Sequence, residues 1–302
     1  MQNEFRPRSR VDPKSAYLSQ FARNVTSQDG EDGVIEKIFE IMPPANRYCV
    51  EIGAFDGKYL SNTWNLIINH GWHGVLIEGR EFLYQKVAER FGAANPEVEG
   101  RFSDKVTLIH QYAAFEGPRS LDAMLAQARV SRDLDFISID IDSNDWYLWD
   151  SMTVYQPRVV LIEFNATIPN DVCFVQERDF NVNQGCSLLA LIDLGKRKGY
   201  ELVATTVANA FFVRKEAFAA FGIADNDIDA MYFFGQLQTR LFQGFDGELI
   251  VSGYQKLHWP NVPFAQEDIQ VLPKSLRRYG IMVSDSMLDA RAQMRASEEA
   301  KS

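Results

Sequence analysis

Acidic side chains follow two apolar runs of the sequence, and together they could do chemistry. Asp140 and Asp142 come after the run LDFISI, while Glu163 and Asn165 close the run VVLIEF. The two-residue spacing puts Asp140 and Asp142 on one side of an extended chain. Carboxylates gathered beside a cation can support a positively charged cofactor, act as the general base for a hydroxyl, or bind Mg²⁺.

A glycine-containing turn after an earlier apolar run suggests where a cofactor would lie. The segment VEIGAFDG places Gly53 and Gly57 after a strand, with Glu51 two residues before the first glycine. It matches neither GxGxxG nor a P-loop, and Glu51 would repel a diphosphate. Glu78, which ends the next run, can accept hydrogen bonds from both hydroxyls of an adenosyl ribose. These features favour an adenosyl ligand without phosphates, although a plain strand-to-helix turn with a solvated glutamate is the alternative.

The elements that would position these residues form an α/β fold. Short apolar runs alternate along the chain with segments of helical period, which is typical of a sheet covered by helices. The predicted strands are residues 48–52, 74–77, 106–110, 134–139, 159–164, 200–205 and 209–213. The predicted helices are residues 33–41, 62–69, 81–91, 120–128, 146–152 and 187–198. The carboxyl ends of such strands share one edge of the sheet, so the acidic residues and the glycine turn should meet there.

The last two predicted strands and the segment after them differ from the rest. Only residues 205–208 separate YELVAT from NAFFV, so these strands should be antiparallel neighbours. After residue 215 the pattern becomes aromatic and rich in proline, with a hairpin expected around Asp246 and Gly247. We expect a cofactor-binding domain with an N-terminal helical segment over residues 1–215, an appendage packed on it over 216–288, and a polar tail over 289–302.

Composition excludes several classes of protein. The 302 residues are 46% hydrophobic and carry 41 acidic against 31 basic side chains, for a net charge of −10. That charge disfavours nucleic acid and anionic membranes as partners. The N-terminus has no apolar run typical of a secretory signal or an anchor, so we expect a cytoplasmic protein. The three cysteines lack metal or disulfide spacing and should be small buried apolar residues.

Several motifs in order resemble one family, the class I S-adenosylmethionine-dependent methyltransferases of the FkbM type, in particular their Star-related branch. The motifs are SQDGEDGVIEKIF, VEIGAFDGKYLSNTW, GWHGVLIEG, DFISIDIDSNDWYLW, VVLIEFNA, and GYELV followed by NAFFVR. They span residues 27 to about 215. The resemblance implies a Rossmann-like fold with a seven-stranded, mostly parallel sheet that ends in an antiparallel hairpin.

The resemblance also implies a cofactor site. Its members would be Glu51, Gly53, Ala54, Gly57, Asn62, Thr63, Glu78, Tyr112, Ala113 and Asp140. The glycine turn would approach the methionine part of S-adenosylmethionine, Glu78 would hold the ribose, and Tyr112 would lie near adenine. Asn62 and Thr63 would lie near the cofactor's carboxylate, although helix capping also explains them. Family members often have proline after the ribose-binding glutamate, where this chain has Gly79.

The N-terminal motif has two interpretations. Asp29 and Asp32 are suited to capping the helix that follows. The resemblance implies that this segment lies over the cofactor cleft, where Gln28 and Glu31 could meet cofactor or substrate. One role does not exclude the other.

We therefore expect a methyltransferase that acts on a hydroxyl of a sugar or secondary metabolite, a substrate class that rests on the resemblance alone. Asp142, Glu163 and Asn165 are the expected catalytic residues, and they are also the candidate ligands of a possible Mg²⁺ ion. Phe164 separates Glu163 from Asn165, whereas the metal-dependent relatives have an adjacent pair, and this favours a role without metal. A non-catalytic scaffold and a nicotinamide-dependent dehydrogenase are the alternatives, and a homo-oligomer is possible.

Overall fold

The computed structural model describes residues 10–92, 105–233 and 235–280, together with residues 282, 284, 285 and 289. The chain divides into two compact units: one spans Ser9–Phe234, and the other begins at Gly235. The first unit holds all the residues expected to bind or act. The division expected after residue 215 and the packing of the appendage stay predictions, and the tail 289–302 lies outside the described residues apart from residue 289.

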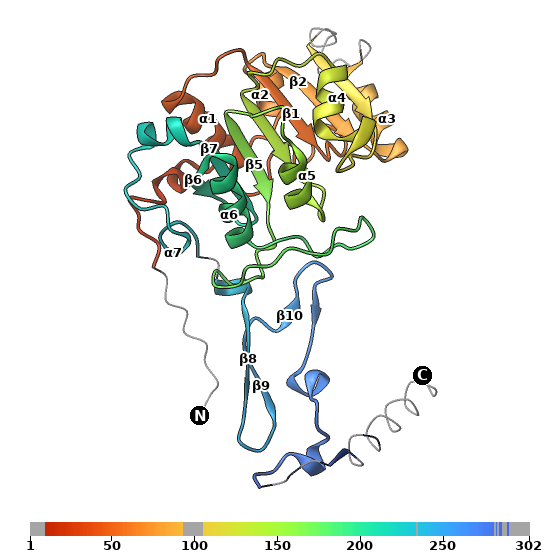
Figure 1. The fold of residues 1–302 in the computed structure, drawn as a ribbon, viewed down its shortest axis with the longest axis vertical. Helices are drawn as coiled ribbons and strands as arrows, with labels where there is room; N and C mark the ends of the chain where they lie inside the picture. Colours follow the sequence, from red (N-terminus) through yellow and green to blue (C-terminus); the bar gives the residue numbers. More distant parts are fainter. Residues whose placement is uncertain are drawn as a thin grey trace. The chain divides into compact units, whose positions relative to one another are not determined.

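The first unit is built on a seven-stranded sheet with the order β3-β2-β1-β4-β5-β7-β6 (Figure 1). Its strands are β1 (Tyr48–Ile52), β2 (His73–Glu78), β3 (Val106–His110), β4 (Phe136–Ile139), β5 (Val159–Glu163), β6 (Tyr200–Thr205) and β7 (Asn209–Arg214). All neighbours are parallel except β7, which runs antiparallel to both β5 and β6. This is the Rossmann-like fold of class I methyltransferases, and it confirms the expected fold class.

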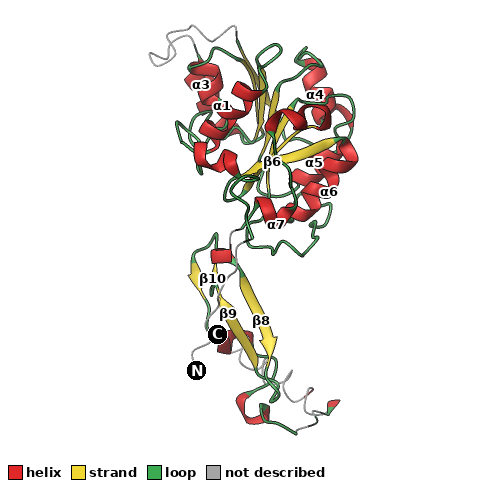
Figure 2. Cartoon of the chain, turned by 90° about the vertical axis from the view of Figure 1, so that its left-hand side faces the viewer, coloured by secondary structure: helices red, strands yellow, loops and turns green. Residues whose placement is uncertain are grey.

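Helices cover both faces of the sheet, which explains why its central strands consist mainly of buried apolar residues. Figure 2 shows α1 and α3 on one side and α4, α5 and α6 on the other. The helices are α1 (Glu31–Ile41), α2 (Trp64–Ile68), α3 (Glu81–Phe91), α4 (Leu121–Gln127), α5 (Asp145–Ser151), α6 (Leu188–Lys198) and α7 (Ile228–Met231). Every residue of β4 is fully buried. Trp149 of α5 packs on Phe212 of β7 with ring centroids 5.0 Å apart.

Local signals in the sequence define the helix ends. Ser120 and Ser187 precede α4 and α6, and each side chain accepts a hydrogen bond from a backbone N–H of the first turn. Gly199 ends α6 with φ +82°, a conformation that glycine adopts without strain. The described residues also form short 3₁₀ helices: Tyr17–Phe21, Gly117–Arg119, Lys215–Phe221, Gly235–Leu237, Gln266–Ile269 and Lys274–Leu276.

The second unit contains two small antiparallel sheets. β8 (Thr239–Gln243) pairs with β9 (Leu249–Gly253), and β10 (Lys256–Leu257) pairs with β11 (Val262–Pro263). The turn between β8 and β9 includes Gly247 at φ +80°, which confirms the predicted hairpin. Among the described helices, none is long and apolar enough to cross a membrane.

The cysteines only partly follow the expectation that all three are buried. Cys49 and Cys186 are buried, whereas Cys173 is exposed. The expectation was wrong for Cys173 because that residue lies outside the core elements, in the long connection between β5 and α6.

Candidate functional site

Three carboxylates meet at the carboxyl edge of the sheet. Asp140 follows β4 and Glu163 ends β5, and the pairing of Ile139 with Ile162 brings these two residues side by side. Oxygen atoms of Asp140, Asp142 and Glu163 all lie within 4.8 Å of one another. Asp142 is exposed, and the other two are half-buried. The structure therefore brings together three acids that are separated by up to 23 positions in the sequence.

Burial and crowding favour the protonated forms of Asp140 and Glu163. Burial, followed by repulsion from Asp145 and Asp142, raises the pKa of Asp140 to about 8. Burial and repulsion from Asp140 raise the pKa of Glu163 well above its ordinary value. Asp140 and Glu163 also hydrogen-bond to each other, which requires a proton on one of them because ionised carboxylates only accept. The pair therefore holds a proton at neutral pH.

Asp145 shapes the turn that presents Asp142. Its buried carboxylate accepts hydrogen bonds from the backbone N–H groups of Ile141, at 2.9 Å, and Ser143, at 3.1 Å. Asp142 lies inside this turn with φ +57°, a strained conformation for a residue with a side chain. Burial raises the pKa of Asp145 to about 7. The sequence analysis did not assign Asp145 a role, although its position at the start of α5 was a capping signal.

Asn165 contributes its amide to its own loop. The side-chain Oδ1 atom accepts hydrogen bonds from the Thr167 N–H, at 3.0 Å, and the Thr167 hydroxyl, at 2.6 Å. The amide nitrogen donates to the Gln184 carbonyl at 3.0 Å. Phe164 is buried and packs edge-to-face on Tyr232. The structure thus groups Asp140 with Asp142 and Glu163, and it gives the Asn165 oxygen two partners outside that group.

Glu51 and the residues after the glycine turn form a closed network. The buried Glu51 carboxylate accepts from the Asn62 N–H and from the Ser61 and Thr63 hydroxyls, each at 2.7 Å. Burial is the main cause that raises the pKa of Glu51. The Asn62 amide donates to the Ser138 hydroxyl at 3.1 Å. Glu51 therefore fixes the residues that precede α2. The helix capping considered for Asn62 and Thr63 is supplied by the Ser61 hydroxyl, which accepts from the Trp64 N–H at 3.0 Å.

Close packing and backbone conformation explain why the turn after β1 contains Gly53 and Gly57. Gly53 has φ +82°, and a Cβ there would lie 1.9 Å from the Asp140 carbonyl oxygen. The N–H groups of Gly53 and Ala54 both donate to the Ile77 carbonyl, at 3.0 and 3.1 Å. Gly57 also has positive φ, and a Cβ there would lie 3.1 Å from the Phe91 ring and 3.2 Å from Val87. The turn packs the ends of β1 and β4 against each other, at the point where the acids emerge.

Glu78 and Tyr112 lie together at the ends of β2 and β3. Glu78 is buried and accepts from the Phe55 N–H, at 3.0 Å, and the Arg80 N–H, at 2.8 Å. A Cβ at Gly79 would lie 2.3 Å from the Tyr112 ring, so only glycine leaves room for that ring. Tyr112 is 61% exposed, and Ala113 beside it is half-buried.

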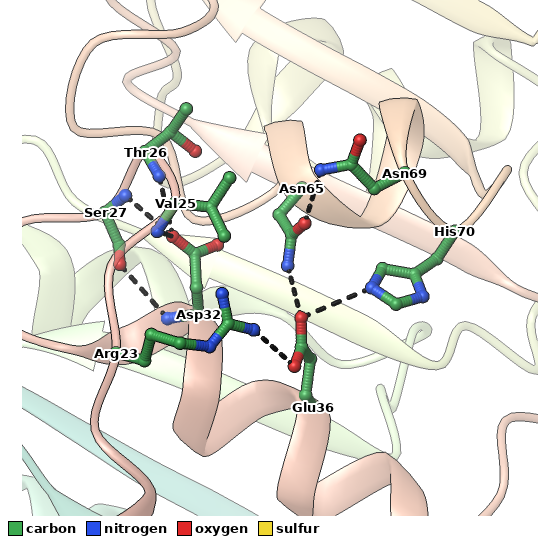
Figure 3. Close-up of polar contacts among 9 residues, drawn as sticks. All are labelled: Arg23, Val25, Thr26, Ser27, Asp32, Glu36, Asn65, Asn69 and His70. Atoms are coloured by element: carbon green, nitrogen blue, oxygen red, sulfur yellow. Dashed lines mark hydrogen bonds and ion pairs between the residues drawn. The ribbon is translucent and has the colours of Figure 1, made fainter.

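Hydrogen bonds tie the N-terminal segment to α1, and α1 to Asn65 of α2 (Figure 3). One oxygen of Asp32 accepts from the backbone N–H groups of residues 25, 26 and 27, at 2.8 to 2.9 Å. The Thr26 hydroxyl donates to the Ser61 carbonyl at 3.0 Å. On the next turn of α1, Glu36 accepts from Arg23 and Asn65 and contacts His70. Gln28 is exposed, and Asp32 fixes the loop that precedes α1. The expected capping of α1 by Asp29 and Asp32 is not found, because Gly30 is the N-cap residue and no side chain caps the helix there.

Glu31 extends the acidic edge towards β7. It is fully buried and accepts from the Thr206 hydroxyl, at 2.6 Å, and the Asn209 amide, at 3.2 Å. Asn209 pairs directly with Glu163 in the sheet, so their side chains share one face. The sequence offered no signal for this link, because residues 31 and 209 are joined only by the tertiary fold.

Comparisons with known protein families and with curated proteins find no match. Among solved structures, the chain is similar to magnesium protoporphyrin IX methyltransferase of Synechocystis PCC 6803, with 11% identity over 61% of this chain and 81% of that one and a TM-score of 0.37. It is also similar to a methyltransferase of Aquifex aeolicus, with 12% identity over 67% of this chain and 97% of that one and a TM-score of 0.38. A third similar structure is a candidate sarcosine dimethylglycine methyltransferase of Galdieria sulphuraria, with 12% identity over 57% of this chain and 62% of that one and a TM-score of 0.38. The match therefore spans less than two thirds of that chain.

Proposed function

We propose that this protein transfers a methyl group from S-adenosylmethionine to a hydroxyl oxygen of a sugar or secondary metabolite. The observation that carries the proposal is the group of Asp140, Asp142 and Glu163 at the carboxyl edge of a class I methyltransferase sheet, beside the Gly53 turn. In open α/β sheets this edge is where ligands bind. The FkbM-type motifs support the substrate class and FkbM membership.

The cofactor would lie along this edge from Tyr112 to the acids. Glu78 accepts the Phe55 and Arg80 backbone N–H groups and, at 3.4 Å, the Arg80 side chain, yet two carboxylate oxygens offer about four acceptor sites, so about one site is left for a ribose hydroxyl. Tyr112 offers an exposed ring beside it for adenine. Glu51, Asn62 and Thr63 would act indirectly in this arrangement, because they hold the turn and α2 in place.

Methyl transfer needs an acceptor oxygen aligned behind the methyl group and a group that takes its proton. Asp142 is the exposed member of the acidic group, so we assign it the role of base, with Glu163 and Asp140 supporting the charge. The acceptor oxygen forms its bond to the methyl carbon, the sulfur keeps the electron pair, and the proton passes to the carboxylate. Holding both reactants in this geometry supplies much of the rate.

A divalent cation fits the same acids only in part. Asp140, Asp142 and Glu163 would hold Mg²⁺, which prefers oxygen ligands and keeps several waters, and the ion would polarise the acceptor oxygen. The side-chain oxygen of Asn165, the fourth candidate ligand, already accepts two hydrogen bonds from Thr167. We therefore propose that the acids act as base and electrostatic support, without a metal.

A chelator separates the two roles. With labelled S-adenosylmethionine and a panel of sugar and metabolite acceptors, we expect EDTA to leave methyl transfer unchanged. Asp142→Asn should depress turnover and leave cofactor affinity intact. Loss of activity with EDTA and recovery with added Mg²⁺ would establish the metal site instead. Full activity of the Asp142→Asn, Glu163→Gln double mutant would place the chemistry elsewhere.

A further inference from the structure

We propose that the acidic edge reads the charge on the cofactor's sulfur, so that cationic S-adenosylmethionine binds more tightly than its neutral thioether product, S-adenosylhomocysteine. The inference rests on the proposed function and goes beyond it, because it states how the site distinguishes substrate cofactor from product. The residues that make the distinction are Asp140 and Glu163, with the Asn209 amide beside them.

The first observation is a group of acidic side chains without a basic side chain to pair with them. The charged groups with the largest effect on the pKa of Asp140 are acidic: Asp145, Asp142, Glu51 and Glu163. The same holds for Glu163. Within the described ranges, no Lys or Arg forms an ion pair with any of these residues. Buried charges are normally paired, so this edge is suited to a cationic ligand.

The second observation is independent of the carboxylates. Asn209 is 7% exposed and pairs with Glu163 on the same face of the sheet, and its Oδ1 atom has no hydrogen-bond partner among the residues that the structure describes. Its amide nitrogen donates to Glu31, which fixes the oxygen as the unpaired end. Asn144, in the loop that carries Asp142, is fully buried and also has an unpaired Oδ1. Both oxygens are hydrogen-bond acceptors that carry partial negative charge, so they favour a hydrogen-bond donor or a cation over an anion.

The consequence follows from the chemistry of transfer. When the methyl carbon leaves the sulfur for the acceptor oxygen, the sulfur keeps the bonding electron pair and loses its positive charge. The released proton passes to a carboxylate, which also neutralises one negative charge. The attraction that held the cofactor therefore disappears at the moment the product forms, and release of the product is favoured.

Three ligands that differ mainly in charge at one position test this inference. Calorimetric titrations with EDTA present would compare S-adenosylmethionine, S-adenosylhomocysteine and sinefungin, whose amine replaces the sulfonium as a cation. We expect both cations to bind at least about ten-fold more tightly than the thioether, because one charge contact at a partly buried edge is worth that much. The preference should shrink as salt is added.

Variants assign the preference to residues. Asp140→Asn and Glu163→Gln should each reduce the preference for the cations several-fold, while affinity for S-adenosylhomocysteine is kept, which also shows that the variant is folded. Glu40→Gln removes one charge from an exposed site on α1 and should leave the preference unchanged. Equal or tighter binding of S-adenosylhomocysteine by the wild type would overturn the inference and leave the proposed function standing. Failure of all three ligands to bind would overturn the proposed function itself.

Discussion

At the residue scale, most carboxylates near the candidate site have partners from the chain itself. Glu51 accepts three hydrogen bonds from residues 61 to 63, and Asp145 holds the turn around Asp142. Asp140, Asp142 and Glu163 differ, because their neighbours are other acids. The distinction separates the acids that support the fold from those that are placed to meet a ligand.

Glu78 is the residue that most directly tests the cofactor's position. Glu78→Ala should weaken S-adenosylmethionine binding about ten-fold or more, because charge-assisted hydrogen bonds to ribose are each worth about 1.5–3 kcal/mol. Glu78→Gln is the matched variant, since it keeps an acceptor for the Phe55 or Arg80 N–H and should preserve thermal stability. Calorimetry and thermal denaturation measure the two effects. Unchanged affinity in a folded Glu78→Ala protein would remove Glu78 from the site.

Gly53 should be required by the fold. A Cβ there would lie 1.9 Å from the Asp140 carbonyl, so Gly53→Ala should cost clearly more than the about 1–2 kcal/mol expected for positive φ alone. Gly222 also has positive φ, +64°, but nothing lies within 4 Å of its Cβ position, so Gly222→Ala should show only the conformational cost. Urea denaturation compares the two variants. Equal losses of stability would show that the turn can relax.

At the element scale, the sheet edge makes stability depend on pH. The folded pKa values of Asp140 and Asp145, about 8 and about 7, lie above the value of 3.8 for a free aspartate, so the folded state binds more protons between these limits. The stability that this protonation contributes is present below about pH 4 and is lost as pH rises to about 8. Melting temperature should therefore fall across that upper range.

Asp140→Asn should flatten this dependence, because the amide does not titrate. Thermal denaturation of wild type and variant in a series of buffers is the measurement. A melting temperature of the wild type that rises from pH 5 to 8, with the same slope in the variant, would contradict the assignment.

The sequence predicted these elements well and their contacts less well. All seven strands lie within about two residues of the expected ranges, because continuous apolar runs bounded by glycine and acidic residues are a strong local signal. α1 begins at Glu31, two residues before the predicted start, because Glu31 is held by Thr206 and Asn209, which no local pattern reveals. The pairing of Glu163 with Asn209 likewise depends on the antiparallel register of β5 and β7.

At the scale of the whole molecule, the two units differ in how well they bury apolar side chains. The first unit contains the buried sheet and every candidate site residue. In the second, all five residues of β8 are exposed, and Phe245 at the hairpin is 97% exposed. Exposed apolar side chains of this kind contribute little to the stability of the protein. We therefore expect the second unit to add little to the stability of the seven-stranded sheet.

A shortened chain tests this separation. A protein ending after Phe233 should fold and bind S-adenosylmethionine with unchanged affinity, because its core and site are complete. Circular dichroism and calorimetry against the full chain are the measurements. Loss of cofactor binding in a folded shortened protein would show that the second unit contributes to the site.

The most direct test of the central claim is a calorimetric titration of the full chain with S-adenosylmethionine and, separately, with NAD. A cofactor site at the carboxyl edge predicts binding of one S-adenosylmethionine per chain, weakened by Glu78→Ala, and no heat with NAD. Absence of S-adenosylmethionine binding by the folded wild type, or binding of NAD in its place, would contradict the account.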